Sequence, residues 1–467
     1  MKALLHMSFA CLIGCLSFVS GASAQLPIPD PGYGSADGIA RVAFDLVGSQ
    51  SDRATAAAAL VDGRLVLAGT VEFNTLQQHD IGFARLMASN GSLDPGFGPS
   101  SNGRVLAGLA PVGEVVDLQT STDGLLYVAN ISSGTVLVGK RLFSGAVDPA
   151  FNGMGHRFLG AGFFLDGATE VVLTRLLALG GGKILVVGYA ATTTRVCAMA
   201  LRLNANGSTD TTFGGGTGRT CVSPIVQGTQ AAGAYDATVL SDGRILLAGT
   251  SVHAGGSGFD MSVARLATDG ALDLSFGPDQ DGWAHVAFDQ GGALNDNAKA
   301  ITVDPLGRIV LAGQVQTQMN YDIGIARLLS NGISDVMFGN GGRVQTGFDL
   351  GGHDYNVASN VFVLPDRHIL IGGATQSNGV VGAALMLHDN GQFESRFGVA
   401  GKFILTDPNG PEAGVLNSAK MVLDGDHMYM IGSIVSPVLL PGGVRNYDFA
   451  ATRHVIPLFS HGFDGNP

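Results

Sequence analysis

The chain has 467 residues, of which 70 are glycine, 46% are hydrophobic and only 14% are charged. This composition is typical of many short strands joined by tight turns, and it excludes both a mainly helical chain and a disordered one. The formal net charge is −12, and the 26 Lys and Arg are mostly single residues at recurring positions, which argues against nucleic acid or anionic lipid as a partner.

The first 24 residues have the three parts of a secretory signal peptide. Lys2 precedes a largely apolar run, and Ala22-Ser23-Ala24 stands before Gln25. We therefore expect cleavage near Ala24-Gln25 and export to the periplasm or the extracellular space. A lipoprotein with its lipid on Cys15 is a weaker alternative, because the apolar run continues past Cys15. No later stretch is long and apolar enough to span a bilayer.

A segment that reads Asp-Gly-Arg, about four apolar residues and then Ala-Gly recurs at a period of about 60 residues. Its clear and degenerate copies give seven units, at residues 62–69, 123–130, 181–188, 242–249, 306–313, 366–373 and 425–432. A repeat array can spread a large core over one long domain, so we expect a single domain over residues 25–467.

Each unit contains four strand-like stretches, which are clearest in the fourth unit at residues 233–240, 244–250, 260–266 and 283–288. Gly, Asn and Asp punctuate the junctions and supply residues that tolerate a positive φ. The second stretch contains Ile245-Leu246-Leu247-Ala248, which is apolar on both faces. Such a strand is predicted to be covered on both sides, as it would be between two neighbouring blades.

A second motif, acid-x-x-aromatic-Gly, lies between the third and fourth stretches. Its copies begin at Asp94, Asp148, Asp210, Asp273, Asp335 and Glu394, and a further copy begins near the N-terminus at Asp30. The last unit, by contrast, ends after its third strand at Arg453. The array is therefore cyclically permuted, and an N-terminal strand is predicted to complete the last blade and close the ring.

We accordingly predict an all-β fold, a seven-bladed β-propeller of four-stranded repeats of about 60 residues. Residues 25–48 hold the closing strand, 49–456 the repeats and 457–467 a tail.

Arginines of the third strand stand seven to nine residues before the motif acid. This spacing predicts structural ion pairs within each blade, with Arg453 reaching Asp30 across the ring closure. The pairs are Arg85 with Asp94, Arg265 with Asp273, Arg327 with Asp335 and Arg453 with Asp30, and Arg141 and Arg202 hold the same place in two other units. Only the sixth unit replaces the arginine, by Met386, and only there is the acid a glutamate, Glu394.

Together these motifs resemble the delta-60 repeat of exported bacterial proteins. The resemblance rests on Asp-Gly-Arg-Ile-Leu-Leu-Ala-Gly, Asp-x-x-Val-Ala-Arg-Leu and Asp-Gly-x-Leu-Asp-x-Ser-Phe-Gly, and it covers residues 30–453, with the second, third, sixth and seventh units departing most. It implies a β-propeller-like fold and export. It implies no activity and transfers no catalytic residue, because the family has no general assigned activity.

Two cysteines follow the signal peptide, Cys197 and Cys221, in predicted neighbouring strands of one unit. Because an exported protein meets oxidising conditions, a disulfide between them is expected. Two unpaired buried thiols are the alternative, and two cysteines alone do not favour a metal site.

No motif in the sequence carries a recognised chemistry. His79, His253 and His353 have no metal-ligand spacing, and no Gly-x-Ser-x-Gly elbow is present. The best site candidates lie in acidic segments that join consecutive blades, and they are Asp289, Asp296, Asp349 and Asp354. Carboxylates in loops suit Ca²⁺, although the spacing fits no recognised calcium loop. Calcium is thus a candidate ligand, and no other cofactor is expected.

The sequence favours an exported, non-catalytic recognition module that binds a protein or a glycan at the cell envelope. The first alternative is a hydrolase or lyase with a polar site at the central channel, with or without calcium. A structural envelope component is the second. The pattern specifies neither the ligand nor the oligomeric state.

Overall fold

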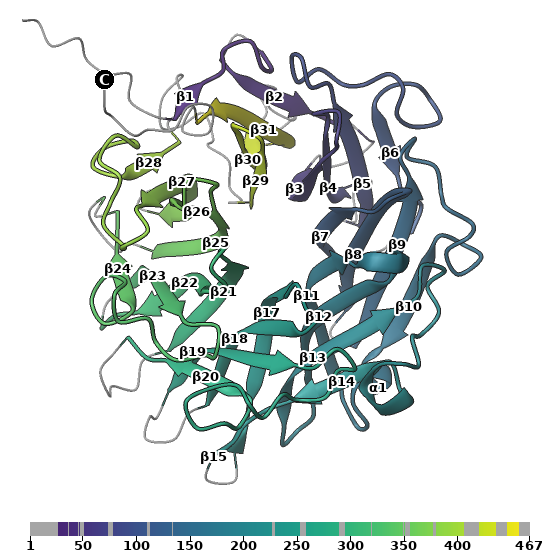
Figure 1. The fold of residues 1–467 in the computed structure, drawn as a ribbon. Coiled ribbons are helices and arrows are strands. Elements are labelled where there is room, and N and C mark those ends of the chain that lie inside the picture. The colour runs from purple at the N-terminus through teal and green to yellow at the C-terminus, as the bar shows by residue number, and fades with distance from the viewer. Residues whose placement is uncertain are drawn as a thin grey trace, which may run out of the picture.

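A computed structural model describes residues 27–456 except 36, 45, 47–50, 73–77, 110–112, 133, 227–228, 253–257, 289–294, 319, 349, 351–354, 377–379, 406–419 and 436–445. The predicted signal peptide and the predicted tail at 457–467 lie outside these residues. The fold is all-β, and its strands form antiparallel four-stranded sheets that follow one another along the chain. Figure 1 shows these sheets arranged around a common centre, with the first strand of each sheet nearest to it.

Most sheets are simple meanders in which consecutive strands pair. The first sheet contains β3 (Arg53–Ala59), β4 (Leu65–Glu72), β5 (His79–Leu86) and β6 (Arg104–Leu106). The second contains β7 (Glu114–Thr120), β8 (Gly124–Ser132), β9 (Thr135–Leu142) and β10 (His156–Gly160). The third contains β11 (Glu170–Ala178), β12 (Ile184–Ala191), β13 (Val196–Leu203) and β14 (Arg219–Val222). The fourth contains β17 (Ala232–Val239), β18 (Ile245–Val252), β19 (Phe259–Leu266) and β20 (Trp283–Val286).

Two further meanders are joined into one eight-stranded sheet by a single parallel bridge between Tyr321 and Tyr355. Their strands are β21 (Asp296–Val303), β22 (Ile309–Gln316), β23 (Tyr321–Leu328) and β24 (Arg343–Thr346), then β25 (Tyr355–Val363), β26 (Ile369–Gln376), β27 (Val380–Leu387) and β28 (Lys402–Ile404). The remaining short elements are β15 (Ile225–Val226), β16 (Thr229–Gln230), α1 (Ala161–Phe164), η1 (Gly180–Gly182) and η2 (Gly214–Gly216).

The last sheet combines strands from the two ends of the chain. It contains β29 (Lys420–Asp424), β30 (His427–Val435) and β31 (Tyr447–Val455), and β31 pairs with β1 (Ile28–Pro29) and β2 (Ile39–Val42). In Figure 1 the purple strands β1 and β2 lie beside the yellow strand β31. The predicted role of an N-terminal strand in this sheet therefore agrees with the pairing of β2 with β31, in which Ile39 faces Thr452.

The prediction of four antiparallel strands per unit is confirmed, with bounds that differ by one or two residues at most strand ends. The apolar second strands are covered on both faces, since every residue of β18 except its last is buried. The reason is that neighbouring sheets pack face to face, so a middle strand has an apolar layer on each side.

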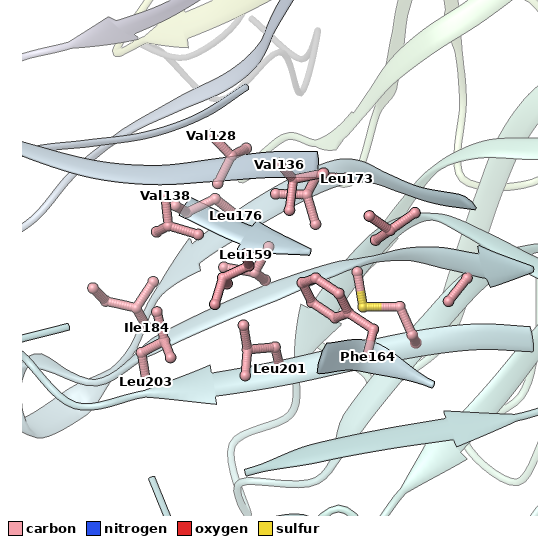
Figure 2. Close-up of a cluster of buried hydrophobic side chains, with 14 of the residues drawn as sticks. Val128, Val136, Val138, Leu159, Phe164, Leu173, Leu176, Ile184, Leu201 and Leu203 are labelled. Carbon is pink, nitrogen blue, oxygen red and sulfur yellow. The ribbon is translucent and has the colours of Figure 1, made fainter. Parts of the chain in front are cut away.

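The hydrophobic core is divided into layers between successive sheets. Figure 2 shows one such layer, in which Val136 and Leu159 of the second sheet meet Leu173 and Leu201 of the third. An equivalent layer joins the last sheet to the first, since Phe449 and Tyr429 belong to the same buried cluster as Leu65. No single central core is needed, because each sheet buries its two faces against its two neighbours.

Each predicted arginine–acid pair that was named from its spacing is present at short range. Arginine Nε lies 2.7 Å from the acid in the Arg85–Asp94 and Arg265–Asp273 pairs, 2.8 Å in Arg327–Asp335 and 2.9 Å in Arg453–Asp30. The guanidinium also lies over the motif aromatic ring, 4.6 Å from the centroid for Arg265 on Phe276. A third contact reaches the next sheet, where Arg265 Nη1 donates to the carbonyl of Ser330 at 3.1 Å.

The second unit departs from the predicted pairing. Asp148 contacts Lys140 at 3.1 Å, whereas the guanidinium of the neighbouring Arg141 lies over Phe83. Lys140 stands eight residues before Asp148, as Arg265 does before Asp273. The basic residue at that spacing is therefore the one that contacts the acid.

The sequence also did not reveal that the arginine of the Asp-Gly-Arg motif binds the same acid. Arg64 Nη1 lies 2.7 Å from Asp94 Oδ2, so Asp94 holds two guanidinium groups.

A disulfide joins Cys197 of β13 to Cys221 of β14, with 5.4 Å between the Cα atoms. The two strands are antiparallel neighbours, and Cys221 lies opposite Met199 in their register. The bond therefore fixes the outer edge strand of the third sheet to the strand beside it.

Replacing Asp30 with Ala should lower the melting temperature. Arg453, whose side chain is only 10% exposed, would lose both of its contacts to that carboxylate, and the cost should be about 2 kcal/mol of unfolding free energy. Differential scanning calorimetry measures the change. The control is Asp62→Ala, because Asp62 is 51% exposed and its partner Arg64 keeps Asp94. An Asp30→Ala protein that melts like wild type would contradict a stabilising role for the closing pair.

Candidate functional site

The strands nearest the centre share a local irregularity. In β3, β7, β11, β17, β21 and β25 the register with the next strand shifts by one residue, which leaves one residue bulged in each strand. The bulged residues are Thr55, Val116, Thr174, Tyr235, Lys299 and Ser359. A bulge redirects nearby side chains, so these positions decide what faces the centre.

Three charged residues that directly follow such bulges form one cluster. Arg175 Nε lies 3.0 Å from Asp236, and Arg175 Nη1 lies 3.3 Å from Asp117. Each acid also accepts a backbone hydrogen bond from the next sheet, from Leu176 N to Asp117 and from Ile301 N to Asp236, both at 2.9 Å. Burial raises the pKa of Asp236, while Arg175 opposes that rise. These charges are thus largely used to connect neighbouring sheets.

A cavity of about 220 Å³ lies against this cluster and is lined by the central strands of five sheets. Its lining includes Asp117, Arg175, Asn360 and Lys420 together with the apolar ends of β3 and β29. Asn360 also bridges sheets, since its Oδ1 accepts from Met421 N at 2.9 Å. The polar lining therefore has a structural explanation.

Tyr235 and Lys299 are the bulged residues of two adjacent sheets, and they touch. Lys299 Nζ lies 3.4 Å from the centroid of the Tyr235 ring. Burial lowers the pKa of Lys299 to about 8 and raises that of Tyr235. An amine with a pKa of about 8 is partly neutral near physiological pH, so it can accept a proton.

A larger pocket, of about 410 Å³, opens where the central strands begin. We call it the aromatic pocket, because five rings are among its lining residues. The lining is Tyr189, Val196, Ala231, Ala232, Gly233, Tyr235, Thr250, Phe259, Asn295, Asn297, Gln314, Tyr321 and Tyr355. Phe259 is 38% exposed and Tyr355 is 42% exposed, so part of the aromatic surface faces solvent.

The parallel bridge between β23 and β25 places two of these rings together. Tyr321 and Tyr355 pair in the register, and their ring centroids lie 5.2 Å apart. Asn356, which is fully buried, holds the junction by donating from Nδ2 to the carbonyl of Tyr321 at 3.1 Å. The two rings thus form a pair in the lining of the pocket.

The side chain of Gln314 carries a polar group that no described residue satisfies. It is only 6% exposed and lines the aromatic pocket, yet its Nε2 has no hydrogen-bond partner among the described residues. A buried amide without a partner costs about 1–3 kcal/mol. In a pocket, such a donor is suited to an oxygen of a ligand.

Of the four acids predicted to bind calcium, only Asp296 lies within the described residues. It is fully buried at the start of β21, and its Oδ2 accepts from Phe288 N at 2.8 Å. Asp52 has the equivalent bond to Phe44 N at 2.9 Å, which indicates a recurring structural use of this position. Asp289, Asp349 and Asp354 lie outside the described residues, so the calcium site stays a prediction.

Sequence reasoning missed the aromatic pocket. Its residues come from β12 through β25, and no motif marks them. Tyrosine content was no signal either, because the third to sixth units hold four of the chain's eight tyrosines, which is no more than their share. In the part of the chain that the structure describes, no helix combines the length and apolarity that a membrane span requires.

Comparison with protein families gives a partial match. A family model described as "Domain of unknown function (DUF5122) beta-propeller" matches residues 62–97, 182–213 and 240–276, which together are less than half of the chain. A comparison with curated proteins found no match.

Solved structures of low similarity cover most of the chain. A protein of unknown function from Dyadobacter fermentans is 16% identical, with a TM-score of 0.41, over 90% of this chain and 99% of that one. Sqt1 from Chaetomium thermophilum, bound to the N-terminus of ribosomal protein L10, is 10% identical, with a TM-score of 0.40, over 89% and 100%. The polysaccharide lyase Uly1 is 10% identical, with a TM-score of 0.41, over 91% of both chains. No function is transferred at these values, and the family model supports a β-propeller repeat family.

Proposed function

We propose that this chain is an exported seven-bladed β-propeller that binds a glycan in the aromatic pocket. The single observation that carries the glycan proposal is the combination of partly exposed tyrosine rings with a buried amide donor, Gln314 Nε2, that has no described partner, in one pocket. Aromatic rings can cover the apolar C–H faces of sugars, and amide groups can bind their hydroxyl groups.

The seven-bladed ring is supported by three observations. The sequence has seven repeats, β2 pairs with β31, and a buried layer joins the last sheet to the first. Closure of this kind protects the sheet edges that an open array would expose. Export is supported by the signal-like N-terminal sequence and is compatible with the disulfide between Cys197 and Cys221.

A glycan suits the pocket better than a protein surface does. The volume of the pocket, about 410 Å³, falls in the range of about 300–1,000 Å³ that is usual for small-ligand sites. The tyrosines are amphipathic, and the lining residues that the structure describes include the amides Asn295, Asn297 and Gln314 but no carboxylate, lysine or arginine. A neutral glycan, or the neutral part of an acidic one, is therefore the expected ligand. If the chain binds a protein instead, that binding should be unaffected by substitutions in this pocket.

Replacing Tyr321 or Tyr355 with Ala should weaken glycan binding by about tenfold or more, because each change removes an aromatic face from the pocket. A screen of envelope polysaccharides by thermal shift would find the ligand, and isothermal titration calorimetry would measure its affinity. Tyr447→Ala is the matched control, since Tyr447 begins β31 as Tyr321 begins β23 but does not line the pocket. Unchanged affinity in both pocket variants would contradict the proposal.

Replacing Gln314 with Met should have opposite effects on binding and stability. It removes the amide that a ligand would use, so affinity should fall about tenfold, while the free protein should gain about 1 kcal/mol of unfolding free energy because a buried unpaired donor is removed. Calorimetry and chemical denaturation measure the two quantities. A loss of stability without any change in affinity would assign Gln314 to the fold rather than to a ligand.

Lys299 supports a second candidate function, a lyase that acts on an acidic glycan. A neutral amine beside Tyr235 could take the proton next to a uronate carboxylate. The C–H electron pair would then form a C=C bond, and the glycosidic oxygen would leave with the C–O electron pair and take a proton from solvent. This alternative requires the substrate to reach Lys299 past Tyr235, which lines the pocket.

If Lys299 is the base, the lyase rate should rise with pH and level off above about 8, and it should fall about tenfold for each pH unit below that value. The reason is that only the neutral amine accepts a proton. Absorbance of the unsaturated product measures the rate, Lys299→Met should abolish it, and Tyr235→Phe should keep the ring contact and much of the rate. Binding of a uronate glycan without any product would leave the non-catalytic role as the function.

A further inference from the structure

In most units the motif acid is held by two basic residues, one at the start of the second strand and one near the end of the third. Asp210, for example, contacts Lys183 Nζ at 2.5 Å and Arg202 Nε at 2.6 Å. The sixth unit is different, because both basic positions have changed. His368 occupies the first position, and Met386 stands where the third-strand arginine is expected.

Two histidines and the glutamate of this unit converge. His368 Nε2 lies 3.3 Å from Glu394 Oε2, and His388 Nε2 lies 3.7 Å from the same oxygen. One ligand atom from each of the three residues lies within 4.8 Å of the others. Tetrahedral zinc, with bonds of about 2.0–2.1 Å to nitrogen and oxygen, requires its ligand atoms to be separated by about 3.4 Å. The two nitrogen–oxygen distances, 3.3 and 3.7 Å, are close to that separation.

The surroundings of His368 match those of a metal ligand. Its Nδ1 lies 2.9 Å from Asp366 Oδ2, while its Nε2 faces Glu394. A carboxylate beside the far nitrogen is the usual outer contact of a metal-bound histidine, because it fixes the tautomer and the ring orientation. The side chain is only 12% exposed, and Nε2 has no hydrogen-bond partner among the described residues. With Nδ1 beside Asp366, Nε2 is the nitrogen available to a metal.

We propose that His368, His388 and Glu394 form a binding site for a divalent transition-metal ion of the zinc class, with Asp366 as the outer contact of His368. Two imidazoles and one carboxylate favour such an ion over Ca²⁺ or Mg²⁺, which prefer oxygen ligands. His388 is 42% exposed, so the fourth coordination position faces solvent and is open to water or a ligand.

Arg396 competes with the metal for Glu394. Its Nε and Nη2 lie 2.9 and 2.7 Å from Oε1 and Oε2, so Arg396 and Glu394 form a bidentate pair. The Arg396 side chain is 40% exposed and can move toward solvent. Metal on Oε2 displaces Nη2 but leaves the contact of Nε with Oε1. Affinity is therefore set by competition between the metal and this guanidinium.

The site is independent of the aromatic pocket. His368 precedes β26 and His388 follows β27, at the strand ends where Ile369 pairs with Leu387. Tyr355 of the pocket pairs instead with Gln376, at the other end of β26. Metal binding and glycan binding can therefore be tested separately.

The test is isothermal titration calorimetry of Zn²⁺ into the mature chain, 25–467, purified without a polyhistidine tag and stripped with a chelator. We expect one ion per chain and a rise in melting temperature on binding. His368→Ala and His388→Ala should each weaken this binding by about 100-fold, and Asp366→Asn by about 10–100-fold. Arg396→Gln should strengthen it, because the competing cation is gone.

His427→Ala is the matched control. His427 holds the same place in the seventh unit and lies 3.0 Å from Asp426, but it belongs to no described group of three metal-ligating residues. Its loss should leave zinc affinity unchanged. Melting temperatures in chelator show whether each variant folds. Absence of saturable zinc binding in the folded wild-type chain, or binding that survives the combined His368→Ala and His388→Ala changes, would overturn the proposal.

Discussion

The fold depends on one repeated contact, a guanidinium that is shared between its own sheet and the next. Arg265 binds Asp273 through Nε, lies over the ring of Phe276 and donates to the carbonyl of Ser330 in the following sheet. The neighbouring backbone repeats the link, since Gly277 N donates to the carbonyl of Asn331 at 2.9 Å. A charge that is mostly buried is tolerated because each of the three guanidinium nitrogens has a partner. The same contact therefore completes one sheet and sets its distance from the next.

The two ends of the chain are joined by this same contact. Arg453 binds Asp30, lies 4.5 Å from the centroid of Tyr33 and donates to the carbonyl of Ala88 in the first sheet. In most other units, the acid and the aromatic residue follow the arginine in the sequence. In the last sheet these two residues, Asp30 and Tyr33, come from the N-terminal part of the chain. Residues more than 400 positions apart are thereby brought into one ordinary unit.

Repeated contacts also indicate where function should be sought. A residue that recurs in every unit is required by every sheet, so it carries no information about a single site. Two exceptions are Gln314, whose buried Nε2 has no described partner, and the sixth unit, where His368 and Met386 replace the two basic residues and His388 approaches Glu394. Each departure leaves a polar group for which the repeated contacts supply no hydrogen-bond partner. That is the physical reason to propose a ligand at both places.

The amino-acid sequence by itself determined the number of repeats, the four strands of each unit, the permuted order and most of the charge pairs, because these depend on local spacing and on turn chemistry. It predicted a pair for Arg141 where Lys140 contacts the acid, because these adjacent residues stand seven and eight residues before Asp148 and neighbouring side chains on a strand point to opposite faces. Only the tertiary structure brought together the tyrosines of separate sheets, the cluster of Asp117, Arg175 and Asp236, and the two histidines around Glu394. These groups arise from packing between sheets and from bulges that redirect side chains, and neither leaves a periodic signal in the sequence.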